Sequence, residues 1–110
     1  MKVAVIGSKG LVIRDLEELL PRGTKEIVLG GAQDIAKSVR ECLAAYENDI
    51  KLVEFLPDYE QYGDDAPVQR DMVAVKYSDI VLAFWDGKSI GTKFVIDYCN
   101  EHDIPVRVFV

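Results

Sequence analysis

The chain has 110 residues, a length typical of one domain, and 49% of them are hydrophobic, which is enough for a buried core. Its 13 basic and 19 acidic residues give a formal charge of −6. This acidic balance argues against a nucleic-acid binder, because such proteins usually present a basic surface to the phosphates.

The apolar runs are too short for a membrane protein, since a spanning helix needs about 20 apolar residues. A strand pattern begins at Lys2, so we expect no signal peptide and a cytoplasmic protein. Cys42 and Cys99 are then expected to be free thiols that pack in the core.

Short apolar runs and helical patterns alternate along the first half of the chain. Residues 3–6 form a continuous apolar run, which predicts a strand buried on both faces. After a turn at residues 7–10, helical spacing predicts a first helix with a buried stripe of Val12, Leu16, Leu19 and Leu20. A strand at 26–29, a helix at 34–47 and a strand at 51–56 follow.

The second half begins with an irregular acidic loop, residues 57–67, and long loops of this kind tend to be functional or mobile. We expect it to act as a lid. The pattern then predicts a helix, a central strand, a helix and a last strand, at residues 68–77, 80–85, 92–101 and 106–110.

This alternation predicts a single α/β domain over residues 1–110, with a three-layer Rossmann-like fold and a five-stranded parallel sheet. Strand order 3-2-1-4-5 and the flavodoxin-like order 2-1-3-4-5 both fit the pattern. In the first order, the turns that follow strands one and four would face each other across one crevice, where such folds bind ligands.

The strongest candidate site is the turn at residues 86–92, between the central strand and the next helix. Such a turn leaves backbone N–H groups unpaired at the positive end of the helix dipole, which favours an anion such as phosphate. Lys88 would add a charge, and Ser89 and Thr92 would add hydroxyl donors. The turn is completed by Asp86, Gly87 and Gly91. The alternative is a helix start capped by Ser89 or Thr92 without a ligand.

Two further glycine turns are weaker candidates, because glycine turns are common in α/β proteins. They consist of Gly7, Ser8 and Lys9 after the first strand, and of Gly30 and Gly31 after the second. We expect both to converge on the same sheet edge as residues 86–92.

Two side chains outside the glycine turns could complete the site. Arg70 could grip a phosphate, or could be a surface arginine paired with a nearby aspartate. Trp85 could stack on a base or could pack in the core, and strand alternation places it on the opposite face from Phe84.

Catalytic and metal signatures are lacking. The chain has one histidine, His102, and no Ser/His/Asp or Cys/His arrangement, so we expect no catalytic residues. The carboxylates of the acidic loop match no metal signature, and we expect neither a metal nor a cofactor.

Four stretches together resemble the SLOG superfamily, the Rossmann-like group of the LOG-type phosphoribohydrolases and the DNA-processing protein A domain, and especially small YspA-like proteins. They are the opening strand and turn Val5-Ile6-Gly7-Ser8-Lys9, the Gly30-Gly31-Ala32 turn, Tyr62-Gly63 with Arg70-Asp71, and residues 78–92, SDIVLAFWDGKSIGT. The resemblance implies strand order 3-2-1-4-5 and a nucleotide-derived ligand, and dimers are common in this superfamily.

The chain departs from the family pattern at several positions. Asp34 and Ala36 replace the Gly and Asp that usually follow the GGA turn, Asp71 replaces an Asn, and Asp64 replaces a basic residue. Val95 stands where LOG-type enzymes carry the catalytic Glu. A valine can neither attack nor stabilise a cationic transition state, so hydrolysis by that route is disfavoured.

These observations predict binding of a phosphorylated nucleoside or a nucleotide-derived ligand, as a sensor or binding module without catalysis. A first alternative is an N-glycosidase for nucleoside monophosphates that uses Asp86 or Asp97 as a substitute carboxylate. A second is a DNA-processing role, which the acidic charge disfavours. A small nucleotide-like ligand is the expected partner, with no nucleic acid and no membrane, and a homodimer is a further expectation.

Overall fold

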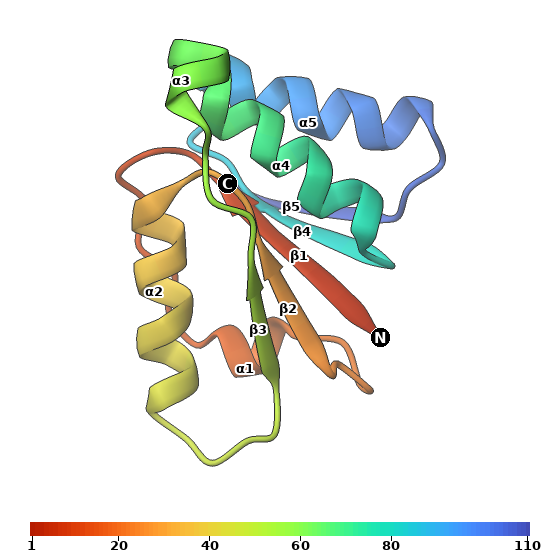
Figure 1. Ribbon diagram of the computed structural model, residues 1–110. Helices are drawn as coiled ribbons and strands as arrows, with labels where there is room; N and C mark the ends of the chain where they lie inside the picture. The colour runs from red at the N-terminus through yellow and green to blue at the C-terminus, as the bar shows by residue number, and fades with distance from the viewer.

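Five parallel strands form one sheet in the order β3-β2-β1-β4-β5 in the computed structural model, which describes residues 1–110 (Figure 1). This confirms the predicted α/β fold and the order 3-2-1-4-5, and it excludes the flavodoxin-like order. The strands are β1 (Lys2–Gly7), β2 (Glu26–Leu29), β3 (Lys51–Glu54), β4 (Ile80–Phe84) and β5 (Val106–Phe109).

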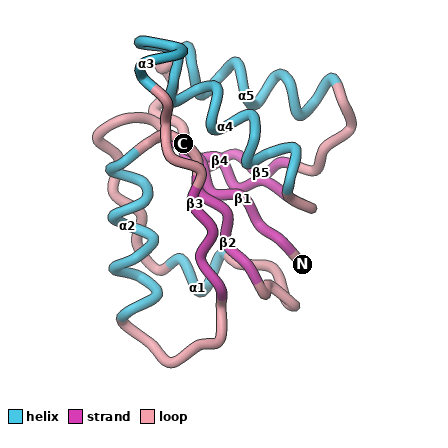
Figure 2. The backbone as a smooth tube through the Cα atoms, viewed as in Figure 1, coloured by secondary structure: helices cyan, strands magenta, loops and turns pink.

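Helices cover both faces of the sheet, with α1 and α2 on one side and α4 and α5 on the other (Figures 1 and 2). None of them is long and apolar enough to cross a membrane. The helical elements are α1 (Leu16–Leu19), α2 (Gln33–Ala44), α3 (Tyr59–Tyr62), the 3₁₀ turn η1 (Gly63–Asp65), α4 (Ala66–Tyr77) and α5 (Ile90–Glu101).

The continuous apolar runs of β1 and β4 supply both faces of the core. Val5 and Leu82 belong to the cluster that packs under α1 and α2, whereas Ile6 and Val81 belong to the cluster under α4 and α5. Central parallel strands are buried on both faces, and this is why neither run alternates with polar residues. The same alternation puts Phe84 and Trp85 on opposite faces of the sheet, as predicted.

The predicted first helix is wrong over most of its length. Helix α1 is a single turn that begins at Leu16, and Val12, which was expected in its buried stripe, is 69% exposed. Two backbone N–H groups of the preceding loop bond to side chains of α2 instead of to helical carbonyls, Gly10 to Asp34 and Ile13 to Ser38. Asp15 then adopts a left-handed backbone with φ of 55°, which no helix interior tolerates.

The acidic stretch 57–67, predicted as an irregular loop, is largely helical. It contains α3 and η1, and α4 begins inside it at Ala66. The Asp58 carboxylate accepts a hydrogen bond from the Gln61 N–H and so caps α3. Pro67 lies in the first turn of α4, where a missing N–H costs nothing, so it starts a helix rather than ending a loop.

Candidate functional site

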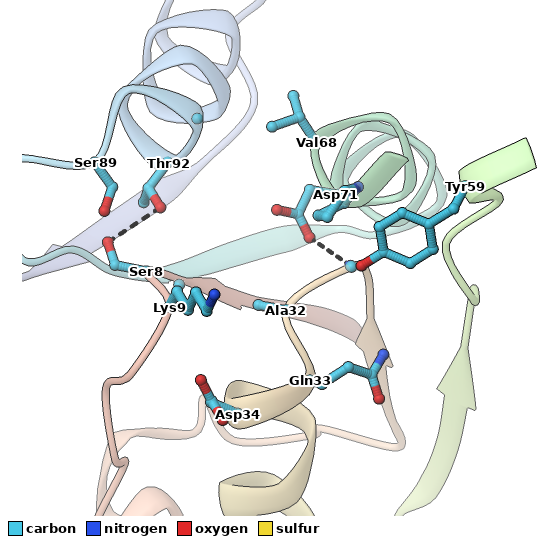
Figure 3. Close-up of a pocket in the computed structure, with 14 residues that line it drawn as sticks. Ser8, Lys9, Ala32, Gln33, Asp34, Tyr59, Val68, Asp71, Ser89 and Thr92 are labelled. Atoms are coloured by element: carbon cyan, nitrogen blue, oxygen red, sulfur yellow. Dashed lines mark hydrogen bonds between the residues drawn. The ribbon is translucent and has the colours of Figure 1, made fainter. Parts of the chain in front are cut away.

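A pocket of about 420 Å³ opens at the carboxyl edge of the sheet, beside the end of β1 (Figure 3). It lies at the point where the strand order reverses, since β1 has β2 on one side and β4 on the other. Open α/β sheets bind ligands at this point. Five segments line it: residues 7–9 after β1, 31–34 at the start of α2, Tyr59 of α3, Pro67, Val68 and Asp71 of α4, and Ser89, Gly91 and Thr92 at the start of α5.

Three 12-residue helices, α2, α4 and α5, point their N-termini at this pocket. The residues that precede them, Ala32, Asp65 and Ser89, make no side-chain capping hydrogen bond. The first N–H groups of a helix have no partner within the helix, and the dipole adds positive potential there. This applies in full to α2 and α5, whereas the Ala66 N–H of α4 donates to the Gly63 carbonyl and Pro67 has no N–H. The pocket is therefore favourable for an anion.

A hydrogen bond joins the turn after β1 to the start of α5. The Ser8 Oγ and the Thr92 Oγ1 lie 3.2 Å apart, and the Asp86 N–H donates to the Ser8 Oγ at 3.2 Å. Both hydroxyl residues are buried, with 1% and 6% of their surfaces exposed. The two turns that the sequence placed on one crevice are thus held against each other, and Thr92 is committed to Ser8 rather than to capping α5.

Asp86 shapes the turn before α5 from outside the pocket. Its carboxylate accepts hydrogen bonds from the Ser89 N–H at 2.7 Å, the Lys88 N–H at 2.8 Å and the Ser89 hydroxyl at 2.9 Å. These hydrogen bonds, the Ser89 N–H first, lower the pKa of Asp86 to about 2. The Ser89 side chain is therefore held by Asp86 and does not cap the helix.

The glycines of the second turn permit close packing. A Cβ at Gly31 would lie 2.1 Å from the Pro67 Cα, and one at Gly30 would lie 2.2 Å from the Asp71 Oδ1. Helix α4 thus approaches the β2–α2 turn more closely than any side chain would allow. Gly31 lines the pocket, whereas Gly30 lies behind it.

Asp71 is a pocket residue that sequence reasoning did not place in the site. Its Oδ1 accepts a hydrogen bond from the Gly31 N–H at 2.9 Å, and only 6% of the residue is exposed. Burial raises the pKa of Asp71 to about 7, although the Gly31 N–H partly opposes the rise. The spacing of Pro67, Val68 and Asp71 was the available signal, since it puts all three on one helix face once α4 begins at Ala66.

Lys9 is the one basic side chain that lines the pocket, and Figure 3 shows it between the Ser8–Thr92 pair and Asp34. The exposed Asp34 carboxylate accepts a hydrogen bond from the Gly10 N–H at 2.9 Å. Tyr59 directs its phenol oxygen inward from α3 (Figure 3). The lining therefore combines one ammonium group with the two carboxyl groups of Asp34 and Asp71.

Several residues expected in the site lie outside the pocket. The Arg70 Nε donates to the Leu56 carbonyl at 2.6 Å, so the guanidinium is turned toward the chain after β3 and pairs with no aspartate. The Trp85 indole N–H donates to the Ser89 carbonyl at 3.0 Å and braces the turn. Lys88 is exposed, and Gly87 with φ of 81° makes the turn beside it.

No three His, Cys, Asp or Glu side chains come together in a way that could hold a metal ion. Cys42 and Cys99 are free thiols. A second, apolar hollow of about 260 Å³ lies on the other side of the β4–α5 turn, lined by Leu11, Val12, Phe84, Trp85, Asp86, Phe109 and Val110.

A scan against family models, a search of curated proteins and a search of solved structures found no match to this chain. The resemblance to the SLOG superfamily therefore stays a prediction that rests on the motifs.

Proposed function

We propose that the pocket binds a phosphorylated nucleoside or a nucleotide-derived ligand, and that the protein is a sensor or binding module of the SLOG type. The observation that carries the proposal is the convergence of three helix N-termini on one cavity at the carboxyl edge of the sheet, two of which, those of α2 and α5, have no side-chain cap on their first N–H groups. Its volume of about 420 Å³ falls within the roughly 300–1,000 Å³ of ligand pockets.

The phosphate fits best between Lys9 and the start of α5. There the first N–H groups of the helix would act together with the Lys9 ammonium. Hydrogen bonds from an ammonium to a phosphate are charge-assisted and contribute about 1.5–3 kcal/mol each. The Ser8–Thr92 hydrogen bond holds the two sides of this anion subsite at a fixed separation.

The nucleoside fits best between α3 and the start of α4. Tyr59 is 57% exposed and offers an aromatic face for stacking, and Val68 adds an apolar side chain to the lining. Because α3 is one short turn with no buried residue, it can adjust around a bound base, as the predicted lid would.

The two carboxylates that the enzyme alternative would use lie away from the pocket. Asp86 lies outside the pocket, and Asp97 is paired with Lys93 at 2.8 Å on the exposed side of α5. Val95, at the position of the LOG-type catalytic Glu, is fully buried in the core and cannot touch a ligand. The N-glycosidase alternative through Asp86 or Asp97 therefore finds no support in the geometry.

The formal charge of −6 disfavours a nucleic-acid partner, and the two free thiols fit a cytoplasmic location. The homodimer expected from the resemblance is tested by the mass of the protein in solution.

A thermal-shift screen tests the proposal, with the four nucleoside 5′-monophosphates, ADP-ribose, NAD and inorganic phosphate. A ligand at 100 times its Kd should stabilise the fold by about 2.7 kcal/mol. Lys9→Ala should weaken binding by about tenfold or more, since it removes a charge-assisted contact. Lys88→Ala is the matched control, and it should leave the shift unchanged. No shift with any compound would refute the proposal, as would a shift that Lys88→Ala removes and Lys9→Ala spares.

A further inference from the structure

The Asp71 carboxyl group has one oxygen inside the fold and one oxygen toward the pocket. Oδ1 accepts the Gly31 N–H, whereas Oδ2 makes no hydrogen bond within the chain. No fully buried side-chain oxygen or nitrogen lacks a partner, so Oδ2 is open to the pocket. Figure 3 shows it directed into the space between α4 and the Ser8–Thr92 pair.

Two contacts hold the carboxyl group in this position. The Asp71 backbone lies so close to Gly30 that a Cβ there would come within 2.7 Å of the Asp71 Cα and 2.9 Å of its nitrogen. On the other side, the Gly31 N–H fixes Oδ1 at 2.9 Å. Oδ2 is therefore preorganised, and any ligand that fills the pocket must satisfy it or leave it without a partner.

The charges around Asp71 do not favour its ionised form. Among the residues that line the pocket, only Lys9, Asp34 and Tyr59 are otherwise charged or titratable, and no basic group lies within 4.0 Å of Asp71. Next to it on α4, Arg70 is turned toward the Leu56 carbonyl.

The remaining charged groups of the elements packed against α4 lie elsewhere. Lys2 and Glu26 are the first residues of β1 and β2 and lie near Tyr77, at the ends of these strands that are far from the pocket. Glu60 of α3 and Asp64 and Asp65 of η1 are exposed before α4 begins. On α5, Lys93 is paired with Asp97, and Glu101 is exposed at the C-terminal end of the helix. None of these groups offers Asp71 a counter-ion.

We propose that Asp71 selects the ligand as a neutral carboxyl group, which donates its O–H to a hydrogen-bond acceptor of the ligand, so that binding takes up one proton. This inference rests on the proposed function, because it needs an anionic ligand in the same pocket. An anion beside an ionised, buried carboxylate is costly, whereas a protonated one supplies a hydrogen bond. The raised pKa of Asp71, about 7, puts the free group close to this state.

The sign of the pH dependence follows from the linkage. Below pH 7 the free protein already carries the proton, so affinity does not change with pH. Above pH 7 each unit should weaken binding by up to about tenfold, since the proton must be taken from solution. A carboxylate that instead accepted a ligand hydroxyl or amino group would give the opposite slope.

Isothermal titration calorimetry with ADP-ribose and with inorganic sulfate, from pH 5.5 to 8.5, tests the inference. Both probes keep a constant charge over this range. At pH 8, titrations in two buffers of different ionisation enthalpy should show uptake of nearly one proton. Asp71→Asn should bind with the same affinity at every pH, because its amide donates permanently while its carbonyl accepts the Gly31 N–H. The control Asp34→Asn should keep the wild-type slope.

The outcomes separate the two proposals. Binding of either probe without a pH dependence, binding that strengthens with pH, or loss of binding in Asp71→Asn at pH 6 would overturn the role of Asp71 alone. Absence of binding for both probes at every pH would overturn the proposed function together with this inference.

Discussion

The hydroxyl groups of Ser8 and Thr92 lie 3.2 Å apart although 84 residues separate them in the chain. Ser8 follows β1 and Thr92 is the third residue of α5, so the contact ties together the two turns that border the anion subsite. Both side chains are buried, so the loss of this hydrogen bond should cost more stability than the loss of one at the surface.

Removing this contact from either side should cost unequal amounts of stability. Thr92→Val keeps the shape and leaves Ser8 bonded to the Asp86 N–H, so we expect a loss of about 1 kcal/mol. Ser8→Ala leaves both Thr92 and the Asp86 N–H without their partner, and we expect about 2–3 kcal/mol. Urea unfolding measures both values. Equal losses, or a larger loss for Thr92→Val, would show that the network does not work through Ser8.

Two glycines of the pocket should respond differently to alanine. At Gly31 a Cβ would meet the backbone of Pro67 at 2.1 Å, so Gly31→Ala should cost about 3 kcal/mol or prevent folding. At Gly91 a Cβ would meet only the Val68 Cγ2 at 2.8 Å, a methyl group that can rotate away. The gain in helix propensity should offset that contact to within about 1 kcal/mol. Thermal unfolding of both variants checks the order, and a tolerant Gly31 would contradict the close approach of α4.

Asp71 should make the protein less stable as pH rises. Its pKa is about 7 in the folded protein, against about 3.9 for an unfolded aspartate. The stabilising contribution is therefore complete below pH 4 and is lost as pH rises through 7. Asp71→Asn removes this dependence, so the variant should gain on the wild type between about pH 4 and 8 by an amount on the order of a few kcal/mol, with no further change above that range. The difference between their urea-unfolding free energies across this range measures the effect, and a constant difference would contradict it.

Asp86 should have the opposite pH dependence. Its pKa is lowered to about 2 by the hydrogen bonds of the Ser89 and Lys88 N–H groups. Its contribution is present above about pH 4, where an unfolded aspartate is ionised, and fades as pH falls toward 2. Asp86→Ala should therefore unfold at a lower urea concentration than the wild type at pH 7, and the gap should narrow below pH 4. A gap that persists at pH 2 would mean that the turn does not depend on the charge.

The sheet could be predicted because its signals are local. The apolar runs of β1 and β4 are continuous since both faces of these strands are buried, and this needs no knowledge of the neighbours. The strand order could not be derived in the same way, because two orders fit one pattern, and the resemblance to a family decided between them. The first helix was predicted wrongly because helical spacing at Val12 and Leu16 competes with tertiary hydrogen bonds to Asp34 and Ser38, which the sequence does not show.

The site was predictable by segment but not by side chain. Parallel strands bring the turns after β1, β2 and β4 to one edge, so Ser8, Gly31 and Thr92 follow from topology. Lys88 was expected beside them because it lies in the same turn. In the structure its backbone N–H donates to the Asp86 carboxylate, and its side chain is exposed outside the pocket. Asp71 was missed although it lies within the predicted helix 68–77, because the sequence does not show that its face of α4 packs against Gly30 and borders the pocket.

The most direct test of the nucleotide site is a ¹H–¹⁵N chemical-shift titration with nucleoside monophosphates and ADP-ribose. A nucleotide in the pocket should cause saturable shifts in the amides that line it, at residues 7–9, 31–34 and 89–92, with little change around Val110 in the apolar hollow. Lys9→Ala should weaken the titration, whereas Lys88→Ala should not. Shifts confined to the apolar hollow, or no shifts with any of these compounds, would contradict a nucleotide site at the edge of the sheet.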